Sequence, residues 1–143
     1  MDKINFFYED TSFEVRNKEG LVLWILEVIT SEDYLVSQIN YVFCSDEYLL
    51  QINIDYLKHD YYTDIITFDN SEEEGTIESD IFISIDRIED NAQDQGISFE
   101  QELHRVIIHG VLHLVGYNDK TPDEKNTMRE KENAYLSLPS IQF

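Results

Sequence analysis

The sequence of 143 residues contains one cysteine, two prolines and five glycines. A single thiol, Cys44, cannot form an intrachain disulfide or build the thiolate cages that hold structural zinc. We expect Cys44 to be a small packed side chain rather than a nucleophile, and a lone cysteine favours a reducing compartment. With 42% hydrophobic residues and so little proline and glycine, the composition excludes a disordered chain.

Long apolar runs are absent from the sequence. The apolar stretch at residues 21–29 includes Glu27 and is too short to cross a bilayer. The first residues carry Asp2, Glu9 and Asp10 instead of a basic region followed by an apolar run, so no signal peptide is predicted. The sequence therefore predicts a cytoplasmic protein that has no membrane partner.

Basic residues are scarce, since ten Lys and Arg face thirty Asp and Glu, for a formal net charge of −20. This charge repels polyanions at long range and, taken alone, argues against nucleic acid as a partner. Half of the basic residues nevertheless fall between positions 105 and 131, which allows a local cationic patch. They are Arg105, Lys120, Lys125, Arg129 and Lys131. The alternative is that they form ordinary ion pairs with neighbouring acids on solvated helix faces.

One stretch, residues 109–119, has a spacing that indicates chemistry. His109 and His113 are four residues apart, so on a helix both imidazoles lie on one face and reach one ion. Gly116 is suited to end that helix in a left-handed conformation, which lets Asp119 approach the same ion. Two histidines and a carboxylate suit zinc, and three protein ligands leave a position for water. We predict one catalytic zinc ion per chain. The alternative is a pair of core or surface histidines that bind no metal.

The same spacing matches the long zinc motif of metzincin proteases. In those enzymes a glutamate follows the first histidine and serves as general base, but here that position is Gly110. Another zinc hydrolase, acting on peptides, is therefore a weaker alternative. Glu102 lies seven residues before His109 and on the same helix face, where it can act as a distant substitute base. A solvated or capping role suits Glu102 better.

The stretch resembles most closely the YbeY family of bacterial rRNA maturation factors, whose signature reads His-Gly-x-Leu-His-Leu-x-Gly-Tyr-Asp-His. The chain matches that signature at His109, Gly110, Leu112, His113, Leu114, Gly116 and Tyr117. It departs at the last two positions, where Asn118 and Asp119 replace an aspartate and the third histidine. Aspartate is chemically competent as the third ligand.

Further similarity to the family lies upstream, at Asn53, Tyr56, Asp60, residues 63–68 and residues 80–81. One difference matters for activity. The family has an arginine, thought to serve the nuclease, where this chain has Leu57. Lys58 and His59 follow directly, and either can take the electrostatic role that Leu57 leaves open.

The resemblance implies a zinc-dependent, single-strand-specific endoribonuclease that acts in ribosome biogenesis, at the 3′ end of 16S rRNA. His109, His113, Lys58 and His59 would then be the catalytic residues, and His109, His113 and Asp119 the metal ligands. The implied partners are ribosomal or single-stranded RNA, with ribosomal proteins or a GTPase beside it. The alternative is a non-enzymatic ribosome-assembly factor with a structural metal, which Leu57 and the net charge favour.

The order of predicted elements indicates a single α+β domain over residues 1–143, because strands and helices mix without regular βαβ alternation. Strands are predicted at residues 4–8, 37–44, 64–68 and 77–85, and residues 11–15 form a further pairing segment. Helices are predicted to begin after Asn17, Ser45, Ile85, Ser98 and Thr121 and to end near residues 29, 57, 96, 114 and 135. We expect a mixed sheet of about four strands and a zincin-like central helix that carries the metal ligands.

Overall fold

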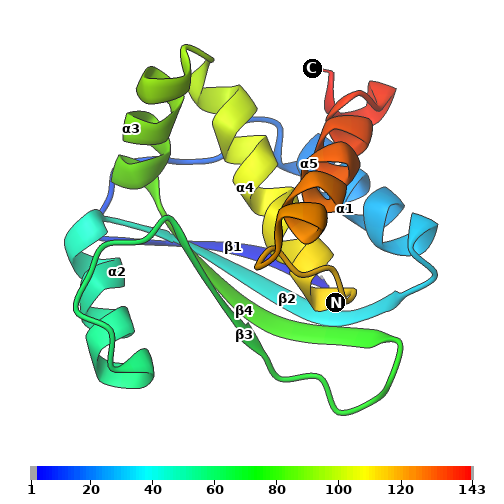
Figure 1. The fold of residues 1–143 in the computed structure, drawn as a ribbon, viewed down its shortest axis with the longest axis horizontal. Coiled ribbons are helices and arrows are strands. Elements are labelled where there is room, and N and C mark those ends of the chain that lie inside the picture. The colour runs from blue at the N-terminus through cyan, green and yellow to red at the C-terminus, as the bar shows by residue number, and fades with distance from the viewer. Residues whose placement is uncertain (1–2, 143) are drawn as a thin grey trace.

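Four strands form one mixed sheet in the computed structural model, which describes residues 3–142 (Figure 1). They are β1 (Ile4–Glu9), β2 (Leu35–Cys44), β3 (Ile65–Asp69) and β4 (Thr76–Ser84), in the order β1-β2-β4-β3. β1, β2 and β4 run parallel, while β3 pairs antiparallel with β4 at one edge. The predicted mixed sheet and α+β class are thus confirmed.

The helices divide between the two faces of this sheet. They are α1 (Lys18–Ser31), α2 (Asp46–Ile52), α3 (Ile85–Gln95), α4 (Phe99–Leu114) and α5 (Pro122–Leu136), with a short 3₁₀ turn at Pro139–Ile141. Alternate residues of β4 such as Ile81 and Ile83 pack in the main core with α1 and α4, whereas Phe82 packs on the opposite face near Leu49 of α2. Successive residues of a strand point to opposite faces of the sheet, so neighbouring residues of β4 pack against different helices.

Helix ends follow the capping residues in the sequence. Ser98 and Thr121 each begin a helix with a capping box, completed by Gln101 and Glu124. The helix after Ser45 departs from the prediction, because its regular part ends at Ile52 and continues as a π-helical turn, Asn53–Leu57. No helix within residues 3–142 is long and apolar enough to cross a membrane.

Residues 11–15 are not a strand, so that prediction was wrong. Asp10 has a positive φ of 55°, which turns the chain away after β1. The amide of Phe13 then donates to the hydroxyl of Thr11, and the amide of Val15 donates to Tyr8 Oη. These side-chain acceptors replace the ladder partners that a strand would need.

Cys44 is fully buried in the end of β2, as the sequence predicted. Burial and the surrounding acidic side chains raise the pKa of its thiol to about 12. The thiolate, which is the nucleophilic form, is therefore not populated near neutral pH. Cys44 acts as a small core side chain.

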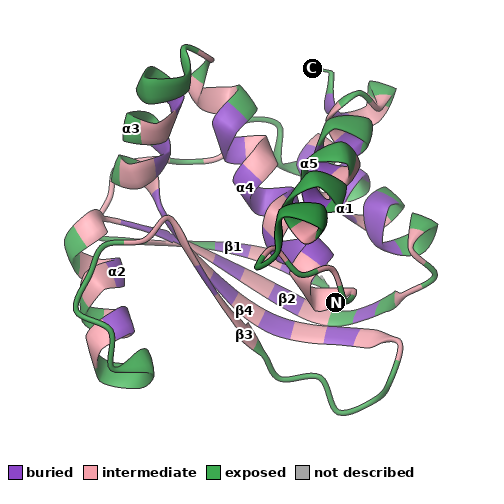
Figure 2. Ribbon diagram, viewed as in Figure 1, coloured by how far each residue is buried: buried purple, intermediate pink, exposed green. Residues whose placement is uncertain are grey.

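Helix α4 is the central element, and Figure 2 shows buried residues along it where α5 is largely exposed. α4 approaches the sheet closely at Gly110, where a Cβ atom would lie 2.9 Å from Ile65 Cδ1 and 3.6 Å from Ile81 Cδ1. α5 is held from its far end, because Trp24 Nε1 donates to the carbonyl of Tyr135 at 2.9 Å. These contacts set the position of α5 beside the histidines of α4.

Candidate metal centre

The two histidines of the predicted motif lie in the C-terminal half of α4. The helix ends at Leu114, and Gly116 has a φ of 105°, a conformation that L side chains rarely adopt. The amide of Tyr117 donates back to the carbonyl of Leu112 at 3.0 Å, which closes the helix end. The chain then returns so that Asp119 reaches both histidines, as the spacing predicted.

The potential ligand atoms of His109, His113 and Asp119 form a triangle. The two Nε2 atoms are 3.0 Å apart, and Asp119 Oδ2 lies 3.3 Å from His109 Nε2 and 3.5 Å from His113 Nε2. Ligand atoms about 2.0–2.1 Å from a tetrahedral zinc ion lie about 3.3 Å from one another. The three residues therefore fit a metal ion of this size, and each is partly exposed, so that a fourth position faces solvent.

Glu132 of α5 is a site residue that the sequence analysis missed. Its Oε2 lies 2.8 Å from Nδ1 of His109, on the side of the ring opposite the ligand triangle. A carboxylate in this position fixes the ring and keeps the proton on Nδ1, which leaves Nε2 free for a metal. Arg105 holds the other oxygen of Glu132 at 2.9 Å. The signal is weak in the sequence because Glu132 lies 23 residues from His109 on another helix.

The contact with Glu132 raises the pKa of His109. Burial lowers it, but the hydrogen bond and charge of Glu132 and the charges of two nearby aspartates outweigh burial, so the pKa lies above its ordinary value. Burial conversely raises the pKa of Glu132, and its bonds to His109 and Arg105 more than offset that effect, so the pKa is lowered. The pair is thus a carboxylate beside an imidazole whose pKa it raises.

Replacing Glu132 by alanine is expected to weaken zinc binding about 10- to 100-fold, because the ring of His109 loses the group that orients it. The matched control is Glu130→Ala, an exposed acid on the same helix. Competition titration with a zinc-sensitive chelator measures both affinities. Equal zinc affinity in the two variants would show that Glu132 only anchors Arg105.

Gly110 explains why a peptidase base is missing beside the metal. A Cβ atom at this position would lie 2.9 Å from Ile65 Cδ1 and 3.5 Å from Thr67 Oγ1, so the close approach of α4 to the sheet leaves no room for a glutamate. The position is buried, and an unpaired carboxylate in it would be strongly destabilising. The geometry therefore argues against the peptidase alternative.

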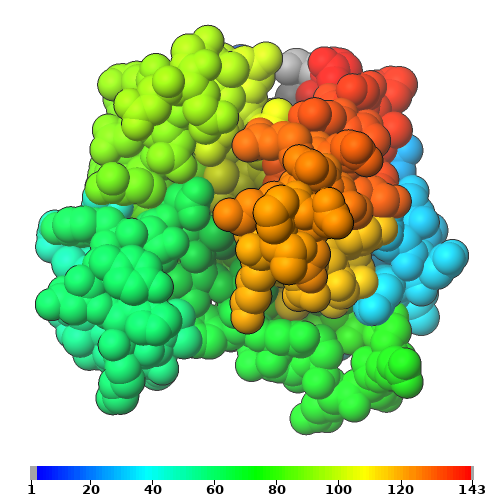
Figure 3. Space-filling view, in the orientation of Figure 1, coloured from blue at the N-terminus to red at the C-terminus, as the bar shows by residue number. Residues whose placement is uncertain are grey.

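Two cavities open at the candidate metal centre, and both are lined by Asp64, Ile65, His109 and Asp119. The larger, of about 580 Å³, extends between α3, α4 and α5, and Figure 3 shows the surface hollowed between α3 and α5. Glu102 lines this cavity and is only 4% exposed, so the predicted solvated or capping role was wrong. It is buried because α3 packs over the start of α4, where Gln95 donates to it at 3.2 Å.

Lys58 and His59 are placed apart from the ligand triangle. Lys58 follows the π-helical turn with a φ of 60°, and His59 is exposed and stacks on Tyr61 at 5.1 Å. Neither residue lines the two cavities beside the metal centre. The structure brings His109, His113 and Asp119 together, but not these two.

The basic residues around the motif differ in how closely they are held by ion pairs. Arg105 is bound to Glu132, and Lys131 to Glu32 at 3.2 Å. Both are ion pairs, but they join residues far apart in the sequence, whereas the ion-pair alternative predicted neighbours on one solvated helix face. Lys125 and Arg129 are exposed and line the larger cavity, where Arg129 lies 3.9 Å from Glu132. A local cationic side of this cavity therefore exists despite the negative net charge.

The chain is similar to known proteins over nearly its whole length. The sequence model of the family described as endoribonuclease YbeY matches residues 3–138. Relatives named endoribonuclease YbeY include one from Cytophaga hutchinsonii, 58% identical and covering 96% of each chain, and one from Flavobacterium johnsoniae, 47% identical and covering 97% of this chain and 99% of the relative. The solution structure of TM1509 from Thermotoga maritima aligns with a TM-score of 0.64 at 25% identity, over 95% of this chain and 88% of that one.

Proposed function

The chain belongs to the endoribonuclease YbeY family, and from this premise we propose that it cleaves single-stranded RNA with one zinc ion held by His109, His113 and Asp119. The observation that carries the proposal is the triangle of ligand atoms 3.0 to 3.5 Å apart beside an open cavity. The chain is a hydrolase that acts on RNA. Its substrate in the cell would be ribosomal RNA in the cytoplasm, at the 3′ end of 16S rRNA.

The chemistry divides between the metal and the surrounding side chains. When bound, zinc lowers the pKa of water to about 7 and supplies positive charge at the scissile phosphate. Glu132 orients His109 through Nδ1 and holds the proton there. Lys125 and Arg129, on the cationic side of the larger cavity, are placed to contact RNA phosphates.

Lys58 and His59 receive a different role from the one that the family's arginine suggests. They lie only a few residues before Thr63 and Asp64 in the sequence. Thr63 and Asp64 line the smaller cavity at the metal centre. We assign them contacts with the RNA strand outside the cavity. Ribosomal proteins or a GTPase remain proposed partners of the surface beyond it.

Zinc-loaded protein is expected to cut an unpaired RNA oligonucleotide and to lose this activity after chelation. Zinc affinity should fall as the pH drops, because protonated imidazole cannot coordinate, and the fall should begin above the ordinary histidine pKa of about 6.5 since the pKa of His109 is raised. Gel analysis of a labelled oligonucleotide, with parallel metal analysis across pH, measures both effects. Cleavage that persists in stoichiometrically zinc-free protein would contradict the proposal.

A further inference from the structure

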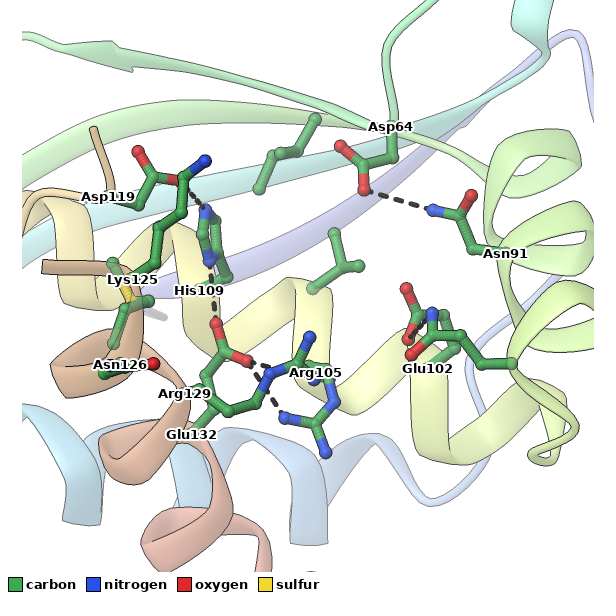
Figure 4. A pocket seen from close by; sticks show the side chains of 14 residues that line it. Asp64, Asn91, Glu102, Arg105, His109, Asp119, Lys125, Asn126, Arg129 and Glu132 are labelled. Carbon is green, nitrogen blue, oxygen red and sulfur yellow. Dashed lines mark hydrogen bonds and ion pairs between the residues drawn. The ribbon is translucent and has the colours of Figure 1, made fainter. Parts of the chain in front are cut away.

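The larger cavity at the metal centre has two chemically different sides (Figure 4). Lys125 and Arg129 of α5 lie on the side of His109 and Asp119, whereas Asp64 and Asn91 lie across the cavity with Glu102. The apolar residues Ile65, Val106 and Met128 also line it. Its volume of about 580 Å³ falls within the range of about 300–1,000 Å³ that is usual for small-molecule sites.

The side away from the metal is rich in hydrogen-bond acceptors. Asn91 Nδ2 donates to Asp64 Oδ2 at 3.2 Å, and Gln95 Nε2 donates to Glu102 Oε1 at 3.2 Å. Asp64 also accepts from the backbone amides of Asp64 and Ile65, and Glu102 accepts from Asn91 as well. Each carboxylate has about four acceptor sites, so part of its accepting capacity stays free for a ligand. A ligand that enters from the metal side thus meets acceptors at the far end.

Burying the carboxylate of Glu102 in this position costs folding free energy. It is 4% exposed, and among residues 3–142 no basic side chain lies within ion-pairing distance of its carboxylate. Burial raises the pKa of Glu102 against the bonds from Gln95 and Asn91. The charge of Arg105 attracts this carboxylate, but the ion pair of Arg105 is formed with Glu132. Buried charges are normally paired, so a carboxylate that makes no ion pair and faces a cavity points to a ligand that satisfies it.

We propose that this cavity holds the nucleoside next to the scissile phosphate and that its acceptor side selects adenine or cytosine by the 6-amino or 4-amino group. This inference rests on the proposed function, because the phosphate is placed at the metal centre beside Lys125 and Arg129. From there the base extends toward Glu102, Asn91 and Asp64. Adenine and cytosine present an amino donor at the edge where uracil presents an acceptor, and unpaired RNA exposes that edge.

Matched mononucleotides test the selection without any cleavage step. CMP and UMP differ at C4, amino against oxo, and at the adjacent N3, which is an acceptor in CMP and carries a proton in UMP. AMP and IMP differ in the same way at C6 and N1. Titration of zinc-loaded protein, followed by amide chemical shifts, should show about tenfold tighter binding of CMP than UMP and of AMP than IMP. The shifted amides should belong to α3, the first half of α4 and α5. Equal affinities within both pairs, or shifts confined to other elements, would overturn the proposal.

Two substitutions separate the base contact from the phosphate contact. Glu102→Gln should reduce the preference within each pair to below threefold, since the amide presents a donor as well as an acceptor. Lys125→Ala should weaken all four nucleotides alike and keep the preference. Glu100→Gln on the same helix is the control, because Glu100 lies outside this cavity.

Thermal unfolding distinguishes selection from a purely structural role of Glu102. Removing an unpaired buried charge should leave the melting temperature of Glu102→Gln unchanged or raised while the preference disappears. A preference retained in a folded Glu102→Gln protein overturns the inference. Selective nucleotide binding without RNA cleavage would refute the proposed function and support the nucleoside site. RNA cleavage with no nucleotide preference would support the proposed function and refute the nucleoside site.

Discussion

Replacing His113 by alanine is expected to remove the bound zinc and to reduce RNA cleavage by about a thousandfold or more. The variant would lose one of the two proposed nitrogen ligands, and His109 and Asp119 alone would leave an incomplete shell. Water activation and charge at the phosphate then disappear together. Metal analysis of purified protein and single-turnover cleavage of an unpaired oligonucleotide measure the two losses.

The control for that experiment is another histidine on the same helix. His104 lies five residues before His109, is partly buried and packs against Trp24, with 5.8 Å between the ring centroids. His104→Gln should keep stoichiometric zinc and cleavage close to that of the unaltered chain. Full activity in a zinc-free His113→Ala protein would overturn the metal mechanism.

The second large effect is expected at Asp119, where the chain departs from the family signature. Asp119→Ala should weaken zinc binding by more than the 10- to 100-fold that loss of an orienting group costs, because a direct ligand is lost. Asp119→His should retain the metal. Its neutral imidazole removes negative charge from the site, so the pH optimum of cleavage should lie lower than in the unaltered chain.

Asp123→Ala supplies the control, since Asp123 is an exposed acid of the neighbouring first turn of α5. Calorimetric zinc titration of the three variants and pH–rate profiles of the active ones provide the measurements. If Asp119→Ala binds zinc as tightly as Asp123→Ala, Asp119 is not a ligand. In a zinc-loaded crystal structure, an Asp119 oxygen about 2.0–2.2 Å from the ion would establish coordination.

The ligand triangle was readable from the sequence because every part of it is local. His109 and His113 meet through helical spacing alone, and Gly116 reverses the chain within a few residues. The capping boxes at Ser98 and Thr121 are equally local, since each joins residues three apart. Such features depend only on backbone geometry and on hydrogen bonds between neighbouring residues. They can therefore be predicted without knowing how the elements pack.

The tertiary structure determines three features that the sequence did not predict. They are the contact of Glu132 with His109, the burial of Glu102 and the conformation of residues 11–15. Glu132 reaches His109 only because α5 docks against α4, and the contact from Trp24 to Tyr135 joins residues 111 apart. Glu102 is buried because α3 folds over α4, although the sequence pattern of α4 alone suggests a solvated face. Residues 11–15 have strand-like composition, yet the amides of Phe13 and Val15 donate to the hydroxyls of Thr11 and Tyr8 instead of to a neighbouring strand. In each case the packing of the elements determines which groups come into contact. The periodicity of a helix or strand contains no information about those contacts.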